Sequence, residues 1–248
     1  MRVLAGSLKD GDTAVRVYAA RLERQEGSLK KFEAALAAAR TRFLKTQRVL
    51  RATESRQGDL MAKLALMPIL IVIACIIAGL YGAIHNQISY SVSPEYFTQF
   101  KFHQFRIEET IPPRVGAAVV GFLAAWWMGI VIGIVLTPIG LVIGAPADYF
   151  RGMIRVFGVV ALTTLIVGLG ALTVSFLTTD AETVPHFSRH GNEIIDDLAF
   201  ARAGTMHNFS YLGGLIGIVT GIVAIFRERR RRKIQKVGGF RGDMQKGS

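Results

Sequence analysis

The stretch from Leu64 to Tyr90, LALMPILIVIACIIAGLYGAIHNQISY, decides the fold of this chain. From Leu64 to Ile84 it runs for 21 residues without a charged side chain. A helix of about 20 apolar residues is long enough to cross the roughly 30 Å hydrocarbon core of a bilayer. The stretch therefore predicts a transmembrane helix over residues 64–84.

The apolar block from Val115 to Ala147 is too long for one upright span. Its 33 uncharged residues would form a helix of about 50 Å at roughly 1.5 Å per residue. Because proline lacks an amide donor, Thr137-Pro138 predicts a break. We expect a span over 115–136 and a short apolar segment over 139–146 in the inner leaflet. Two further apolar blocks predict spans over 156–178 and 208–226.

The distribution of charge predicts the orientation of these spans. The 248-residue chain is 51% hydrophobic, with a net charge of +12 and a mean hydropathy of +0.36. Residues 1–63 hold 14 Lys and Arg against 7 acids, and residues 227–248 hold 9 against 2. Basic flanks favour the cytoplasmic side, where anionic headgroups are their partner rather than nucleic acid. We expect a plasma or bacterial inner membrane protein with both termini cytoplasmic and outer loops over 85–114 and 179–207.

The N-terminal region, residues 1–63, carries a seven-residue apolar repeat that predicts a helix over roughly 13–57. The second apolar position of the seven-residue repeat is less regular, because polar residues such as Gln25, Thr46 and Thr53 occupy it. One interpretation is a coiled-coil oligomer. The other, which the arginines near Arg48 favour, is a basic amphipathic helix on the inner membrane surface. The repeat positions are Leu8, Val15, Leu22, Leu29, Leu36, Phe43 and Leu50.

The composition of the spans argues against several functions. The lone cysteine, Cys75, excludes an intrachain disulfide and a multi-cysteine metal site. The apolar blocks contain no ionisable Asp, Glu, Lys, Arg or His, which argues against a proton-coupled transporter. Glycines spaced four apart predict close helix packing, intramolecular or between copies. These are Gly129 and Gly133, Gly140 and Gly144, and Gly213, Gly217 and Gly221.

The loops have local helix signals. Ser93-Pro94-Glu95 predicts a helix start, with Ser93 as the N-cap, although the alternation in residues 100–103 would also suit a strand. Asn192 to Ala203 reads as a short amphipathic helix. The aromatic residues between Tyr90 and Phe105 predict a belt at the membrane interface.

Two similar clusters stand at span ends that we expect on the same membrane level. His85-Asn86-Gln87-Ile88-Ser89-Tyr90 follows the first span, and His207-Asn208-Phe209-Ser210-Tyr211 precedes the fourth. The structural interpretation, which we favour, is helix capping with interfacial tyrosines. The functional interpretation is a paired ligand for a metal or haem iron, or a polar pocket for a quinone or lipid headgroup. Its candidate binding residues are His85, Asn86, Tyr90, His207, Asn208 and Tyr211.

The other three histidines are weaker candidates for a metal site. His186 and His190 are four residues apart, and His103 lies in the first outer loop with acids nearby. Pro185 and Gly191 make a helix through the pair doubtful.

These observations predict an all-α, four-span transmembrane bundle with an amphipathic or coiled-coil-like cytoplasmic helix in front and a basic tail behind. No hydrolase, nucleotide-binding or metalloprotease motif is present, and the sequence identifies no cofactor. We expect a non-enzymatic scaffold, assembly or sensory subunit that engages a cytoplasmic protein, another copy of itself or the lipid surface. A quinone, metal or haem protein that uses His85 and His207 is the alternative, and a small channel is the third.

Overall fold

The computed structural model describes residues 2–246, with side chains left undescribed at residues 2–14, 19–20, 22–23, 233 and 235–246. It confirms an all-α chain with four helices long and apolar enough to cross a membrane. The lone sheet among the described residues is a two-stranded hairpin. The long helices are α1 (Arg2–Val92), α3 (Pro113–Gly140), α4 (Pro146–Thr178) and α5 (Asp197–Lys246).

The chain divides into two units, residues 1–58 and 59–248. In the first unit, α1 is helical from Arg2 onward, and its repeat positions are exposed wherever the side chains are described. Val15 is 67% exposed and Leu36 is 61% exposed. Leu8 and Leu22 lie outside the described side chains. The helix is therefore present where the repeat predicts it, while the oligomeric interpretation remains a prediction.

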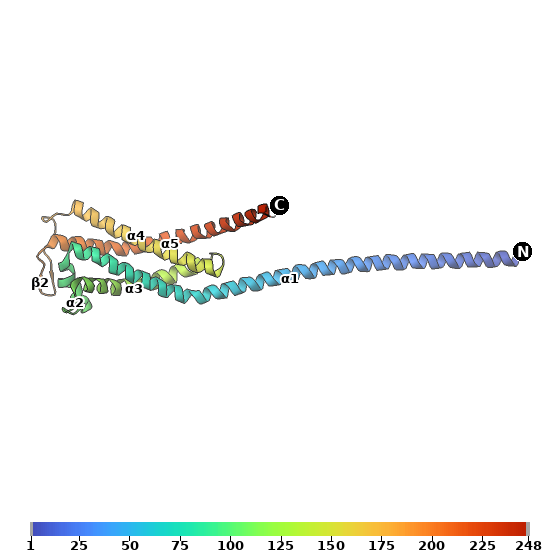
Figure 1. Cartoon of the computed structure of the whole chain (residues 1–248), viewed down its shortest axis with the longest axis horizontal. Coiled ribbons are helices and arrows are strands. Elements are labelled where there is room, and N and C mark those ends of the chain that lie inside the picture. Colours follow the sequence, from blue (N-terminus) through green and yellow to red (C-terminus); the bar gives the residue numbers. More distant parts are fainter. Residues whose placement is uncertain (1, 247–248) are drawn as a thin grey trace. The chain divides into compact units, whose positions relative to one another are not determined.

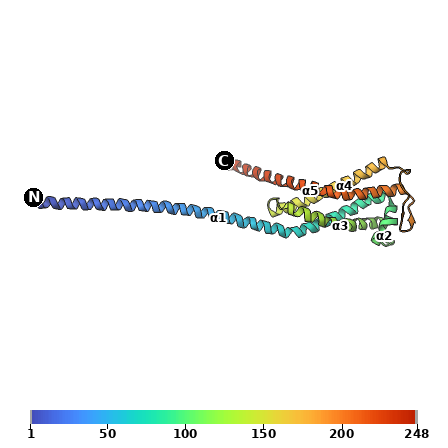
Figure 2. The same ribbon diagram turned by 180° about the vertical axis from the view of Figure 1, so that it is seen from behind.

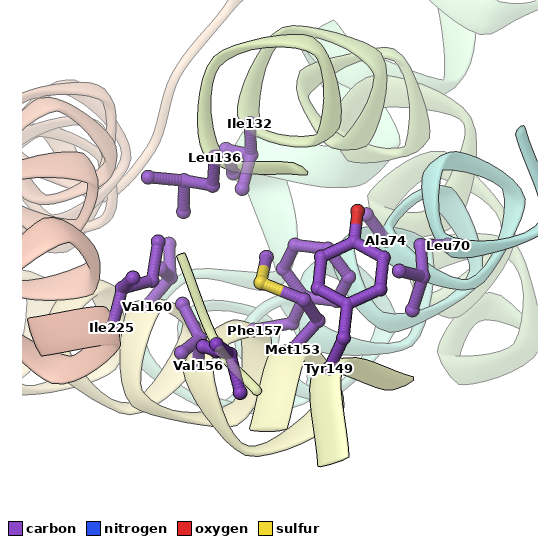
Figure 3. Close-up of a cluster of buried hydrophobic side chains, with 11 residues drawn as sticks. Leu70, Ala74, Ile132, Leu136, Tyr149, Met153, Val156, Phe157, Val160 and Ile225 are labelled. Atoms are coloured by element: carbon purple, nitrogen blue, oxygen red, sulfur yellow. The ribbon is translucent and has the colours of Figure 1, made fainter. Parts of the chain in front are cut away.

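The second unit is a bundle in which α3, α4, α5 and the later part of α1 lie side by side (Figures 1 and 2). Side chains from all four helices converge in one core, as Figure 3 shows. Leu70, Leu136, Phe157 and Ile225 in this core are at most 2% exposed. The opposite faces of the same helices expose large aliphatic side chains, which is the pattern expected when lipid is the solvent.

Glycines allow the helices to approach closely. An added Cβ at Gly121 of α3 would lie 2.1 Å from the Gly82 carbonyl oxygen of α1, and one at Gly129 would lie 2.3 Å from the Cys75 Cα. On α5, an added Cβ at Gly217 would lie 2.9 Å from Val160 of α4. Spaced glycines such as Gly129 and Gly217 thus pack against other helices of the same chain, which is the intramolecular alternative.

The connection between α3 and α4 differs from the sequence prediction. Helix α3 continues through Pro138 to Gly140, so the expected break at Thr137-Pro138 is wrong. A proline within the helix removes one hydrogen bond without ending it. Residues 141–145 instead form a tight turn in which Ile143 is fully buried in the core. The Lys63 ammonium donates hydrogen bonds to the Leu141 and Ile143 carbonyl oxygens at 3.1 and 2.7 Å.

The first outer segment is helical, which excludes the strand alternative. It consists of a π-helical turn, η1 (Tyr96–Lys101), and α2 (Phe102–Phe105). The Tyr96 amide donates to the Ser93 hydroxyl oxygen at 3.2 Å, which confirms the N-cap. Tyr96 and Phe97 are buried in a second apolar cluster. The expected interfacial belt is therefore wrong for these two rings, because neighbouring outer elements cover them.

The second outer segment also departs from prediction. Asn192 lies in a hairpin of β1 (Ser188–Arg189) and β2 (Asn192–Glu193), so the expected helix from Asn192 to Ala203 is wrong at its start. Helix α5 begins at Asp197, where Asp196 accepts the Ala199 amide as its cap. It continues past Gly204 without a break. The Glu95 carboxylate accepts the amides of Ile195 and Asp196, which joins the two outer segments.

Candidate functional site

The bundle brings the two His-Asn clusters together at the outer ends of α1 and α5. The ring centroids of His85 and His207 are 5.0 Å apart, and the rings meet edge to face at 80°. Tyr81, one turn before His85, lies 5.7 Å from the His85 ring, and Tyr96 lies 5.2 Å from the His207 ring. Residues separated by more than 120 positions in the sequence thus form one aromatic and polar cluster.

Hydrogen bonds fix the orientation of the His85 ring. Its Nδ1 lies 3.3 Å from Asn86 Oδ1, while the Asn86 amide nitrogen donates to the Ala117 carbonyl oxygen of α3 at 3.0 Å. Because Asn86 Oδ1 is an acceptor, this contact is a hydrogen bond in the tautomer that has its proton on His85 Nδ1. His85 Nε2 is then the acceptor for the Ser210 hydroxyl, 2.8 Å away.

The Ser210 hydroxyl has two competing acceptors. It also lies 2.9 Å from the Met206 carbonyl oxygen one turn earlier in α5. A hydroxyl has a single proton, so it serves one of these acceptors fully at a time. Gly168 of α4 makes room for this group, since an added Cβ there would lie 2.8 Å from the Ser210 Oγ. Three helices therefore determine where this hydroxyl lies.

A cavity of about 90 Å³ lies among the four helices below this cluster. Its walls are mainly small or apolar side chains of the four helices, such as Ala78, Ala125, Met128 and Phe157. No Asp, Glu, Lys or Arg lines it. Its polar lining residues are Tyr81, His85, Asn86, Thr164, His207, Ser210 and Tyr211.

Two buried polar atoms at the cavity have no hydrogen-bond partner among the described residues. They are His207 Nδ1 and the Tyr81 hydroxyl, which lies near the Ser210 hydroxyl but outside hydrogen-bonding geometry. A buried polar group without a partner costs about 1–3 kcal/mol. Two such atoms beside one cavity have hydrogen-bonding capacity that a water or another small molecule in the cavity would satisfy.

The predicted binding residues do not all reach the cavity. His85, Asn86, His207 and Tyr211 line it, and Tyr211 is half exposed. Tyr90 and Asn208 are not among the lining residues. Tyr90 packs against Phe97 and under the Arg114 guanidinium, which agrees with an anchoring role. Asn208 is exposed on α5.

The histidine pair does not fit a metal or haem site as it stands. Both ring nitrogens of His85 already have protein partners, so neither is free to bind a metal ion. The edge-to-face contact of the rings also leaves no gap for a haem macrocycle. Across the described part of the chain, no group of three or more His, Cys, Asp or Glu residues is arranged to hold a metal.

The other histidines divide between two places. His103 and His190 meet in the outer segments, with ring centroids 5.2 Å apart. His186 Nδ1 instead donates to Asp197 Oδ2 at 2.7 Å. This hydrogen bond raises the pKa of His186 above its ordinary value. The three histidines predicted as metal ligands therefore do not converge on one point.

Sequence reasoning did not select Tyr81 and Ser210 as binding residues. Ser210 belongs to the echoed cluster, so the repeat contained a signal for it. Tyr81 lies within the first apolar block, and its only sequence signal is a position one helical turn before His85.

Comparison with known protein families, curated proteins and solved structures finds no match for this chain.

Proposed function

We propose that this multi-pass membrane protein binds a small amphipathic molecule of the quinone class in the cavity beside Tyr81 and His207. The observation that carries the proposal is the pair of unsatisfied buried atoms at the polar end of an otherwise apolar cavity. A quinone carbonyl oxygen accepts hydrogen bonds, and both a tyrosine hydroxyl and an imidazole N–H donate them. The apolar walls suit the ring.

The size and charge of the cavity favour binding or sensing over redox catalysis. An apolar cavity of about 150 Å³ holds a benzene ring, so the 90 Å³ space takes one ring only with a small outward shift of its walls. No carboxylate or ammonium group lines it to deliver protons to a reduced quinone. The proposed role is a sensory or assembly subunit of a plasma or bacterial inner membrane, with both termini cytoplasmic.

A binding titration tests the proposal. The purified full-length protein is titrated with a short-chain ubiquinone, and quenching of Trp126 and Trp127 fluorescence is recorded. We expect saturable binding that weakens about fivefold in Tyr81→Phe, the effect of one lost hydrogen bond. His207→Phe should weaken it similarly. Asn208→Ala, a neighbouring change outside the cavity lining, serves as the control.

Two results would contradict the proposal. One is quenching that rises linearly with quinone, as for simple partition into the detergent. The other is equal binding by the wild type, Tyr81→Phe and His207→Phe. The melting temperature of each variant, measured without quinone, separates a binding defect from a folding defect. Tyr81→Phe should change that temperature little, because the Tyr81 hydroxyl forms no hydrogen bond of good geometry within the protein.

A second candidate is a scaffold role for the N-terminal helix, supported by the exposed repeat positions of residues 15–50. In a parallel coiled coil, identical repeat positions of two copies face each other. Leu36→Cys in a Cys75→Ser background should then form disulfide-linked dimers of the full-length protein in membranes. Ala34→Cys, off the seam, should not. Equal cross-linking at both positions would indicate random collision between copies of the protein. The lipid surface would then be the partner that we propose for this helix.

A further inference from the structure

A groove of about 550 Å³ runs between α4 and α5 at the arginine-rich ends of their apolar segments. We call it the basic groove. Its mouth is formed by Arg155, Arg227, Glu228 and Arg231, and its walls by Val156, Val159, Val223 and Ala224. It is a different site from the cavity beside His85, with which it shares no lining residue.

The mouth of the basic groove has an excess of positive charge. Glu228 is 8% exposed and accepts hydrogen bonds from Arg155 Nη1 at 2.5 Å and Arg232 Nε at 3.2 Å. Arg232 also pairs with Asp148 at 2.9 Å. The two acids therefore balance these two arginines.

Arg227 and Arg231 are left as the surplus charge. Both are exposed at the mouth, and neither forms an ion pair with any side chain that the structure describes. They lie one helical turn apart, so their guanidinium groups are on the same face of α5. An arginine pair in this position can bind a phosphate group through several N–H donors.

The interior of the basic groove suits a hydrocarbon chain. Its walls are valine methyl groups and the small Ala224 side chain. At the deep end, the hydroxyls of Thr163 and Thr220 lie 3.1 Å apart. Each hydroxyl also has a carbonyl acceptor in its own helix, Val159 for Thr163 and Gly217 for Thr220. No polar group in the depth of the groove therefore needs a ligand. The apolar part of the groove extends about 12 Å along α4, from Arg155 to Thr163.

We propose that the basic groove binds one anionic glycerophospholipid. Its phosphate contacts Arg227 and Arg231, with Arg155 held nearby by Glu228, and one acyl chain lies along the valine walls. Basic pockets between membrane helices at the cytoplasmic side are typical sites for anionic lipids. A soluble anion would satisfy the arginines but leave the apolar depth unoccupied. A zwitterionic lipid would bring its own cation to a mouth that is already positive.

Native mass spectrometry of the full-length protein tests the headgroup contact. The protein in mild detergent is mixed with equal amounts of phosphatidylglycerol and phosphatidylcholine of the same acyl chains. We expect one retained phosphatidylglycerol per chain. Arg227→Gln with Arg231→Gln should weaken the binding of phosphatidylglycerol about 30-fold, because each of the two arginines contributes roughly 1 kcal/mol. The matched control is Arg229→Gln with Arg230→Gln, which removes the same charge from neighbouring positions outside the groove.

A second pair of variants tests the acyl-chain contact without changing charge. Ala224→Phe fills the groove and should abolish retention of phosphatidylglycerol, while Val219→Phe on the exposed face of α5 should leave it unchanged. Melting temperatures show whether each variant is folded. If the two double-arginine variants lost phosphatidylglycerol equally, general attraction between charges would explain the binding, and the proposal would be overturned. Retention of phosphatidylcholine equal to phosphatidylglycerol, or undiminished retention in folded Ala224→Phe, would do the same.

Discussion

Lys63 shows how one residue can join two distant parts of this bundle. It stands just before the first apolar stretch, where the sequence suggests only a charged flank. In the structure it is 9% exposed, and its ammonium donates to carbonyl oxygens at Leu141 and Ile143. The turn after α3 leaves these carbonyls without helical partners, so the lysine takes the place of a helix cap.

Replacing Lys63 should therefore destabilise the bundle. Lys63→Met keeps the length of the side chain but removes both hydrogen bonds, and each bond to a charged donor contributes about 1.5–3 kcal/mol. We expect a loss of roughly 2 kcal/mol or more in the free energy of unfolding, measured by SDS titration in mixed micelles. Lys45→Met, an exposed position on the same helix, should change it by less than about 0.5 kcal/mol. Equal effects of both substitutions would contradict the capping role.

The His186–Asp197 pair gives the outer hairpin a dependence on pH. Because the pKa of His186 is raised by its hydrogen bond to Asp197, the folded state favours the protonated imidazole. Its stabilisation is full below the ordinary histidine pKa of about 6.5 and is lost as pH rises through the raised value. An NMR titration of His186 should give a pKa above 6.5, and Asp197→Asn should return it toward 6.5. An identical titration curve in Asp197→Asn would show that the pair does not form.

At the scale of helices, close approach depends on missing side chains. Helices α1 and α3 meet where Gly82 and Gly121 face each other, each leaving no room for a Cβ beside the other's backbone. Lipid supplies little apolar driving force between helices, so packing at such contacts stabilises the pair. The same requirement does not apply to Gly158 or Gly170 of α4, where an added Cβ would meet nothing within 4 Å.

This difference predicts opposite outcomes for the same substitution. Gly121→Ala should separate α1 from α3 and lower the melting temperature markedly, since the clash is with a backbone oxygen that cannot rotate away. We expect a loss of about 2 kcal/mol or more. Gly158→Ala should be neutral or slightly stabilising, by up to about 1 kcal/mol from helix propensity. A thermal scan monitored by size-exclusion chromatography compares the two, and equal melting temperatures would contradict the helix contact.

At the scale of the molecule, four helices long and apolar enough to cross a membrane predict that the two ends of the membrane domain lie on one side. An even number of crossings returns the chain to its starting side, and the basic flanks favour the cytoplasm. The Arg-rich ends of α4 and α5 would then face the leaflet that supplies anionic lipid. Lipid binding in cells as we propose it therefore requires this orientation. Experiments on the purified protein test binding to the basic groove whatever the orientation is.

Single cysteines test this topology. In a Cys75→Ser background, Ser55→Cys and Gln235→Cys should react with a membrane-impermeant maleimide only after the cells are opened. Thr110→Cys and Glu182→Cys, exposed in the two outer segments, should react in intact cells. Labelling of Ser55→Cys and Gln235→Cys from opposite sides would contradict an even number of spans.

The sequence by itself determined the four apolar helices, because uncharged runs of sufficient length have few alternatives in lipid. It also indicated the Ser93 cap and the echo around His85 and His207. Tertiary structure decided the rest. Whether Pro138 ends a helix depends on how its neighbours pack, and Asn192 lies in a hairpin because distant groups such as Glu95 bind the chain that follows it. The contact of Tyr81 and Ser210 with the histidine pair, and the meeting of Arg155 with Glu228, likewise depend on which helix faces align. The spacing of apolar residues in the sequence predicts which face of each helix is buried. Only the packing of the bundle determines which other helix lies against that face.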